Sequence, residues 1–147
     1  SIKNTSKALL RTGTKDSVSD EEMALAAEYW TAVAESMPDW QAVLDRKVAS
    51  SELREHYVHA HGVILQALGQ IGADLLSQKP RGWRTVLKKL TKIDWSRSNE
   101  VWEGRAMVHG RISKARTNVI LTGGLLKQKL GLQLSELEQT EEDKFTK

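Results

Sequence analysis

The residues best suited to chemistry in this chain are basic, and they gather between residues 94 and 118. A guanidinium group forms two parallel hydrogen bonds with a phosphate or a carboxylate. Helix starts expected near Ser98 and Ser113 would add backbone N–H groups that also favour anions. We therefore expect an anion-binding patch in which five cations contact the anion and two amides assist, namely Arg97, Arg105, Arg111, Lys114 and Arg116 with Asn99 and Asn118.

Catalysis finds little support in the residue pattern. The chain has no cysteine, and it lacks the GxSxG and SxxK motifs and a glycine-rich phosphate loop. The serines of the basic stretch are explained by helix capping or turns. We expect that the chain is not an enzyme and that it needs no cofactor.

A metal site is also not expected. Glu52, His56 and His59 fall on one helix face, but a metal needs three or four convergent ligands and this spacing is no zinc signature. The same face carries Gln66 and Gln70, which predicts a solvated polar surface.

Two tryptophans, Trp95 and Trp102, lie among the arginines of the basic stretch. Their rings could stack on bases or on guanidinium groups. They could also be core anchors that fix an irregular loop, and this second interpretation is the favoured one.

Charge is segregated along the chain although the net charge is only +3. Residues 79–129 carry thirteen Lys and Arg against three acids, whereas residues 16–78 carry eleven acids against three Lys and Arg. Such blocks indicate either an anionic partner for the basic block or internal pairing between the two blocks.

The elements that must position the basic stretch are helices, because no alternating strand pattern of useful length occurs. Two adjacent apolar stripes between residues 52 and 78 predict a helix buried over half its girth. The fold class is therefore all-α, a helical bundle around a long central helix at about 52–78. Capping and periodicity predict helices over 18–37, a short stretch from Pro38, 50–78, 83–92, 98–102, 114–130 and a terminal stretch from Ser135.

The helix that Ser113 would cap carries Lys114, Arg116, Thr117 and Asn118 in its first turns. A recognition helix of a helix-turn-helix presents its reading residues at this place. The short helix at 98–102 and a turn at His109 would supply the other half of the motif.

The domain organisation is expected to be simple. Residues 18–147 form one helical domain, and residues 1–17 are a linker or a frayed helix from a missing N-terminal part. No apolar run reaches the roughly 20 residues that span a bilayer, and the lack of cysteine fits a reducing compartment, so we expect the cytoplasm.

Several runs resemble one protein family. They are EYWTAVAESMPDW (28–40), ELREHYVHAHGVILQALGQIG (52–72), KIDWSRSNEVWEGRAMVHGRISKARTNV (92–119) and KLGLQLSELEQ (129–139). Together they resemble the C-terminal part of the DndB family, whose proteins belong to DNA phosphorothioation (DNA sulfur modification) gene clusters. The IDWSRSN, WEGRA and GRISK runs are the most specific.

The resemblance implies a regulatory function, namely repression of the modification cluster through binding of double-stranded DNA at its promoter. In that case the patch residues would contact phosphates, and the two asparagines would contact bases or phosphates. The rival hypothesis is a protein–protein interaction module of the same system. Its partner would be another phosphorothioation protein or the chain's own N-terminal part. Separately, the chain could form a homo-oligomer.

Overall fold

A computed structural model describes residues 19–146, so the predicted segment 1–17 lies outside the described residues. Helices dominate this part of the chain, which confirms the all-α prediction. The α-helices are α2 (Asp20–Glu35), α3 (Pro38–Leu44), α4 (Ser50–His56), α5 (Gly62–Gln78), α6 (Trp83–Leu87), α7 (Arg116–Leu130) and α8 (Glu136–Thr146). Two 3-10 helices, η1 (Lys88–Lys92) and η2 (Glu100–Trp102), and two short strands, β1 (Met107–Val108) and β2 (Arg111–Ile112), lie between α6 and α7.

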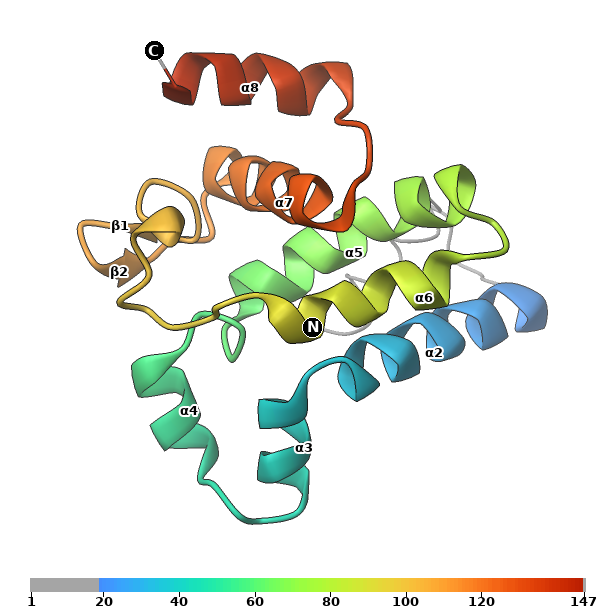
Figure 1. The fold of residues 1–147 in the computed structure, drawn as a ribbon, viewed down its shortest axis with the longest axis horizontal. Coiled ribbons are helices and arrows are strands. Elements are labelled where there is room, and N and C mark those ends of the chain that lie inside the picture. The colour runs from blue at the N-terminus through green and yellow to red at the C-terminus, as the bar shows by residue number, and fades with distance from the viewer. Residues whose placement is uncertain (1–18, 147) are drawn as a thin grey trace.

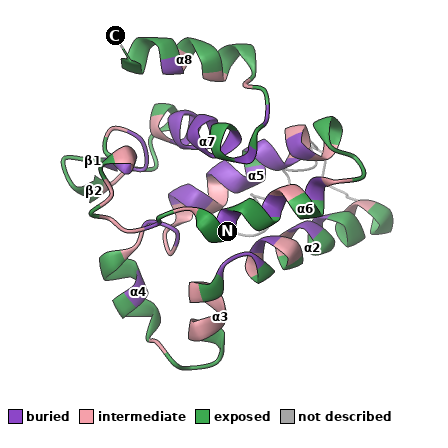
Figure 2. Ribbon diagram, in the orientation of Figure 1, coloured by how far each residue is buried: buried purple, intermediate pink, exposed green. Residues whose placement is uncertain are grey.

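The core lies where α5 packs against α7 (Figure 1). Burial concentrates on these two helices, whereas α4 and α8 are mostly exposed (Figure 2). On its other flank α5 meets α2, where the Tyr29 hydroxyl donates to the backbone oxygen of Leu68 at 2.6 Å. Complete burial raises the pKa of Tyr29, so this buried hydroxyl stays protonated.

The ends of several helices follow the predicted signals. Ser19 caps α2 by accepting from the backbone N–H of Glu22, and Pro38 opens α3. Gly131 ends α7 in the left-handed conformation with a φ of 76°. Ser135 and Glu138 form a capping box at α8, in which each side chain accepts from the other's backbone N–H.

The predicted long central helix is wrong at its N-terminal end, because it is two helices. Tyr57 ends α4 in an extended conformation, and the backbone N–H of Val58 donates to the oxygen of Trp95 at 2.8 Å. The N–H of Arg97 in turn donates to the oxygen of His56. The break lets residues 56–58 pair with residues 95–97, and α5 then carries the central position alone.

The predicted helix-turn-helix is also wrong. A β-hairpin separates η2 from α7, with Met107 opposite Ile112 and a two-residue turn at His109 and Gly110. Both turn residues have positive φ, 52° and 76°, as a tight hairpin turn of this length requires. The strands are too short to leave an alternating pattern in the sequence.

No helix within residues 19–146 has both the length and the apolar composition needed to cross a membrane. No cluster of three or more His, Asp or Glu in the same residues could hold a metal ion.

Candidate nucleic-acid interface

Four of the predicted cations, Arg97, Arg111, Lys114 and Arg116, lie around the hairpin and the start of α7. The last three are exposed and Arg97 is half-buried. Arg97 braces the hairpin turn, because its Nη2 donates to the oxygen of Gly110 at 2.8 Å. Within the described residues, none of the four is ion-paired with an Asp or Glu.

His61 lies beside these cations. Its Nε2 lies 2.8 Å from the backbone oxygen of Arg54. Burial lowers the pKa of His61, and the charges of Arg54, Arg97 and Lys114 lower it further against the raising effect of that hydrogen bond. Because three cations act on one imidazole, they are close neighbours. We call His61, Arg97, Arg111, Lys114 and Arg116 the cationic face, and Arg54 borders it.

Two helix N-termini open at the cationic face. The cap residue of α5 is His61 and that of α7 is Ala115, and neither helix has a side-chain cap or an acid in its first turn. By contrast, α2 and α8 have acidic first turns. Cations at the positive end of a helix dipole are unfavourable unless an anion is bound there. The Lys114 ammonium lies beside Gly62, at 3.0 Å from the position of an added Cβ.

The two predicted asparagines have structural roles. Asn99 caps η2 by accepting from the backbone N–H of Val101, and its Nδ2 donates to the oxygen of Asp94. Asn118 accepts from the Ser113 hydroxyl and donates to the oxygen of Gly104. Both amides brace the loop that presents the cations. The contact of Asn99 and Asn118 with DNA stays a prediction, beside this bracing role.

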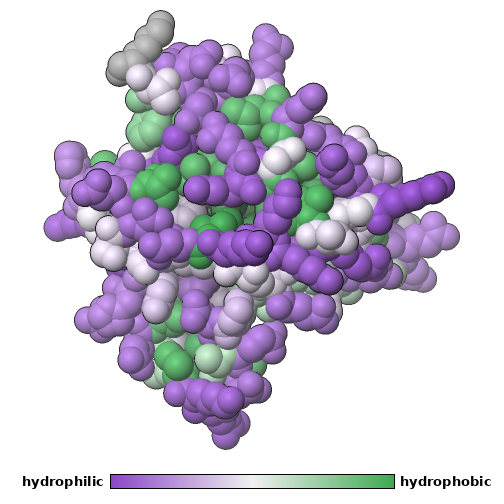
Figure 3. All heavy atoms as spheres, in the orientation of Figure 1, coloured by the Kyte–Doolittle hydropathy of each residue, from purple (hydrophilic) through white to green (hydrophobic). Residues whose placement is uncertain are grey.

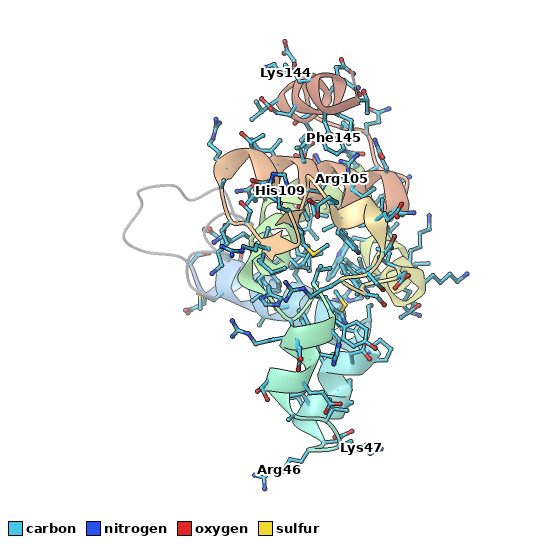
Figure 4. The ribbon with its side chains drawn as sticks, turned by 90° about the vertical axis from the view of Figure 1, so that its left-hand side faces the viewer. Arg46, Lys47, Arg105, His109, Lys144 and Phe145 are labelled. Atoms are coloured by element: carbon cyan, nitrogen blue, oxygen red, sulfur yellow. The ribbon has the colours of Figure 1, made fainter. Side chains whose placement is uncertain are left out.

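Arg105 is buried, and the prediction that it contacts an anionic partner at the surface is wrong. Its guanidinium donates to both carboxylate oxygens of Glu142 at 2.7 and 2.5 Å, and to the backbone oxygen of Leu121. The same group lies 4.5 Å from the centre of the Phe145 ring. Figure 4 shows Arg105 and Phe145 together below α8. No signal in the sequence separates this arginine from the exposed ones.

The tryptophans of the basic stretch are core anchors, as the favoured interpretation predicted. Trp95 and Trp102 are 6% and 0% exposed, and their rings stack at 5.4 Å. The stack continues from Trp95 to His59 at 5.3 Å. His59 is itself buried, so the predicted solvated face at that residue is wrong. This ring stack fixes the irregular segment beside the cationic face.

Internal pairing between the two charge blocks is limited. Among the described residues, Arg84 pairs with Glu28 and Lys127 pairs with Asp74. Neither cation belongs to the cationic face. The acids among residues 19–78 therefore form no ion pair with that face.

A family model described as DndB, DNA-sulfur modification-associated, matches residues 1–133. The matched residues contain the whole cationic face and end before α8 begins. No curated protein and no solved structure matches the chain.

Proposed function

The chain belongs to the DndB family, which is associated with DNA sulfur modification, and we propose that it is a DNA-binding regulator of that system. In this proposal it represses the modification gene cluster by binding double-stranded DNA at the promoter. It catalyses no reaction and uses no cofactor.

The observation that carries the proposal is the cationic face. Its arginines and lysine have no acidic partner in the described residues, and two uncapped helix starts add backbone N–H groups. A row of DNA phosphates supplies the negative charge that both features lack. Because phosphate contacts do not read bases, the face accounts for affinity and positioning rather than for sequence choice.

The test is the salt dependence of binding. Fluorescence anisotropy with a duplex from the cluster's promoter should show affinity falling by roughly 10²–10³-fold between about 50 and about 200 mM salt, for about five phosphate contacts. Arg111→Gln and Lys114→Gln should each weaken binding and reduce the salt slope by about one. Arg81→Gln is the matched control, because Arg81 is an exposed cation between α5 and α6.

Two results would overturn the proposal. One is the absence of duplex binding by the wild type at low salt. The other is unchanged affinity in both Arg111→Gln and Lys114→Gln. Competition with polyglutamate distinguishes DNA binding from the rival function, a protein–protein interaction module. An interface for an acidic protein would bind polyglutamate more tightly than the duplex.

A further inference from the structure

The short helices α3 and α4 line a cavity of about 400 Å³, to which Ala34 of α2 and Leu65 of α5 also contribute. Trp40, Val43 and Leu44 of α3 line one wall at i, i+3 and i+4. Leu53 and Arg54 of α4 line the facing wall. In Figure 3 hydrophobic atoms reach the surface near these helices, within a hydrophilic surround.

The apolar stripe of α3 is covered at one end only. Trp40 packs against the core, and its Nε1–H donates to the backbone oxygen of His59 at 3.1 Å. No residue of α3 is buried, and Leu44 is 70% exposed. On α4 only Leu53 is buried. An exposed leucine at the mouth of an apolar cavity is unfavourable in water, and a cavity of this volume falls in the range of small-molecule sites.

The polar groups at the cavity indicate the chemistry of an occupant. Ser50 and Arg54 lie one helical turn apart on α4, and within the described residues neither side chain makes a hydrogen bond or an ion pair. The guanidinium is therefore available to a carboxylate or a similar anion. The hydroxyl beside it adds a second donor.

His59 supplies an independent observation at the same cavity. Its Nε2 is hydrogen-bonded to the Asp39 carboxylate at 2.8 Å, and its buried Nδ1 has no hydrogen-bond partner. Because a carboxylate accepts from Nε2–H, Nδ1 of the neutral ring is an acceptor without a donor. A carboxylate offers no donor to this nitrogen, so the charged end of an anionic occupant would lie at Arg54 and Ser50 rather than at His59.

We propose that this cavity binds a small organic anion with an apolar body, such as an aromatic carboxylate. The apolar body lies between Trp40, Leu44 and Leu53, and the carboxylate meets Arg54 and Ser50. The site reaches the cationic face through one residue, because the backbone oxygen of Arg54 accepts from His61 and, at 3.4 Å, from Arg97.

The test is an NMR titration without DNA, so its outcome does not depend on the proposed function. The ¹H–¹⁵N spectrum of the whole chain is followed with 1-naphthoate and with its neutral analogue 1-naphthalenemethanol. Saturable shifts should be confined to α3, α4 and residues 59–65. Naphthoate should bind about tenfold more tightly than the alcohol, as one charge-assisted contact predicts.

Two variants separate the apolar and the charged contacts. Arg54→Gln should remove the preference for naphthoate and leave the alcohol affinity unchanged. Leu44→Asn should weaken both compounds, whereas the matched control Leu137→Asn, at an exposed leucine of α8, should weaken neither. Arg54 and Leu44 are both exposed, so we expect both variants to fold. A ¹H–¹⁵N spectrum that matches the wild type away from the changed residue is the control for folding.

The proposal is overturned if neither compound gives saturable shifts, or if the shifts spread over α7 and the part of α5 beyond residue 65. Equal affinity for the two compounds in the wild type would also overturn it, because the cavity would then bind a neutral apolar molecule. An unchanged preference in Arg54→Gln would place the anion elsewhere.

Discussion

Arg105 and Glu142, 37 residues apart, form a buried two-point ion pair that ties the loop after η2 to α8. Lys127 makes a second tie, because its ammonium is fully buried and meets Asp74 and Glu138. The carboxylates of Glu138 and Glu142 lie over Gly123 and Gly124 of α7, at 3.7 and 3.8 Å from the position of an added Cβ. Charged side chains therefore hold α8 in place more than an apolar stripe does.

We predict that Arg105→Gln lowers stability and spares DNA affinity. Removing one partner of a buried pair leaves the other charge uncompensated, which costs about 3–5 kcal/mol. Urea unfolding should show this loss, and Glu142→Gln should show a similar one. Anisotropy at a temperature where the variant is folded should show DNA affinity of the wild type. If Arg105→Gln were as stable as the wild type but bound DNA more weakly, the prediction would be contradicted and Arg105 would belong to the DNA interface.

We predict that Gly104→Ala is destabilising by about 1–3 kcal/mol or more. Gly104 has a φ of 82°, which side chains rarely adopt, and an added Cβ would lie 2.5 Å from Cε2 of Phe145. Gly82→Ala is the control, because an added Cβ there meets nothing within 4 Å and φ is −113°. Thermal unfolding compares the two, and equal melting temperatures would contradict the strain argument.

The sequence predicted those features that depend on local contacts. Ser19, Pro38, Gly131 and Ser135 mark helix ends because caps and φ restrictions act within a few residues. The apolar stripe of α5 likewise reports the face that meets α7.

What the sequence could not predict depends on distant partners. Arg105 and Arg111 are alike as residue types, and only the position of Glu142 separates them. The break after His56 is equally hidden, because the residues that pair with Tyr57 lie about forty positions later. The helical periodicity continues through the break, since Val58 is buried too.

We predict that Trp102→Ala costs about 3–5 kcal/mol in stability, because a fully buried large ring leaves a cavity. Trp95→Phe should cost less, since a phenyl ring keeps part of the stack with His59. Neither change should alter the DNA affinity of folded protein. A Trp102→Ala protein that is as stable as the wild type but fails to bind duplex would restore the base-stacking hypothesis.

We predict that stability falls as pH falls below about 6.5. Burial lowers the pKa of His59, against the raising effect of the hydrogen bond and charge of Asp39. The pKa of His61 is lowered as well, chiefly by burial. At pH values between the lowered pKa values and the ordinary histidine pKa, the unfolded chain therefore binds more protons than the folded one. The free energy of unfolding decreases as the pH falls through this window.

The measurement for this pH effect is the urea midpoint at about pH 7.5 and about pH 5.5. His59→Gln should reduce the difference between the two midpoints, because one of the two titrating rings is gone. A midpoint that rises on acidification would contradict the sign, and an unchanged difference in His59→Gln would assign the effect to other groups.

DNA affinity should change with pH in the opposite direction. Burial and the charges of Arg54, Arg97 and Lys114 keep the pKa of His61 low in the free protein. A phosphate bound at the cationic face would raise that pKa, so binding takes up a proton and affinity increases as pH falls.

The variant His61→Gln tests whether His61 is the group responsible for this pH dependence of DNA affinity. Anisotropy across about pH 5.5 to 7.5 at constant salt, where circular dichroism shows the protein folded, should give a flatter pH profile for this variant than for the wild type. His56→Gln, at an exposed histidine of α4, should keep the wild-type profile. If His61→Gln keeps the full pH dependence, the phosphates lie away from the start of α5, and the interface then centres on the hairpin and α7.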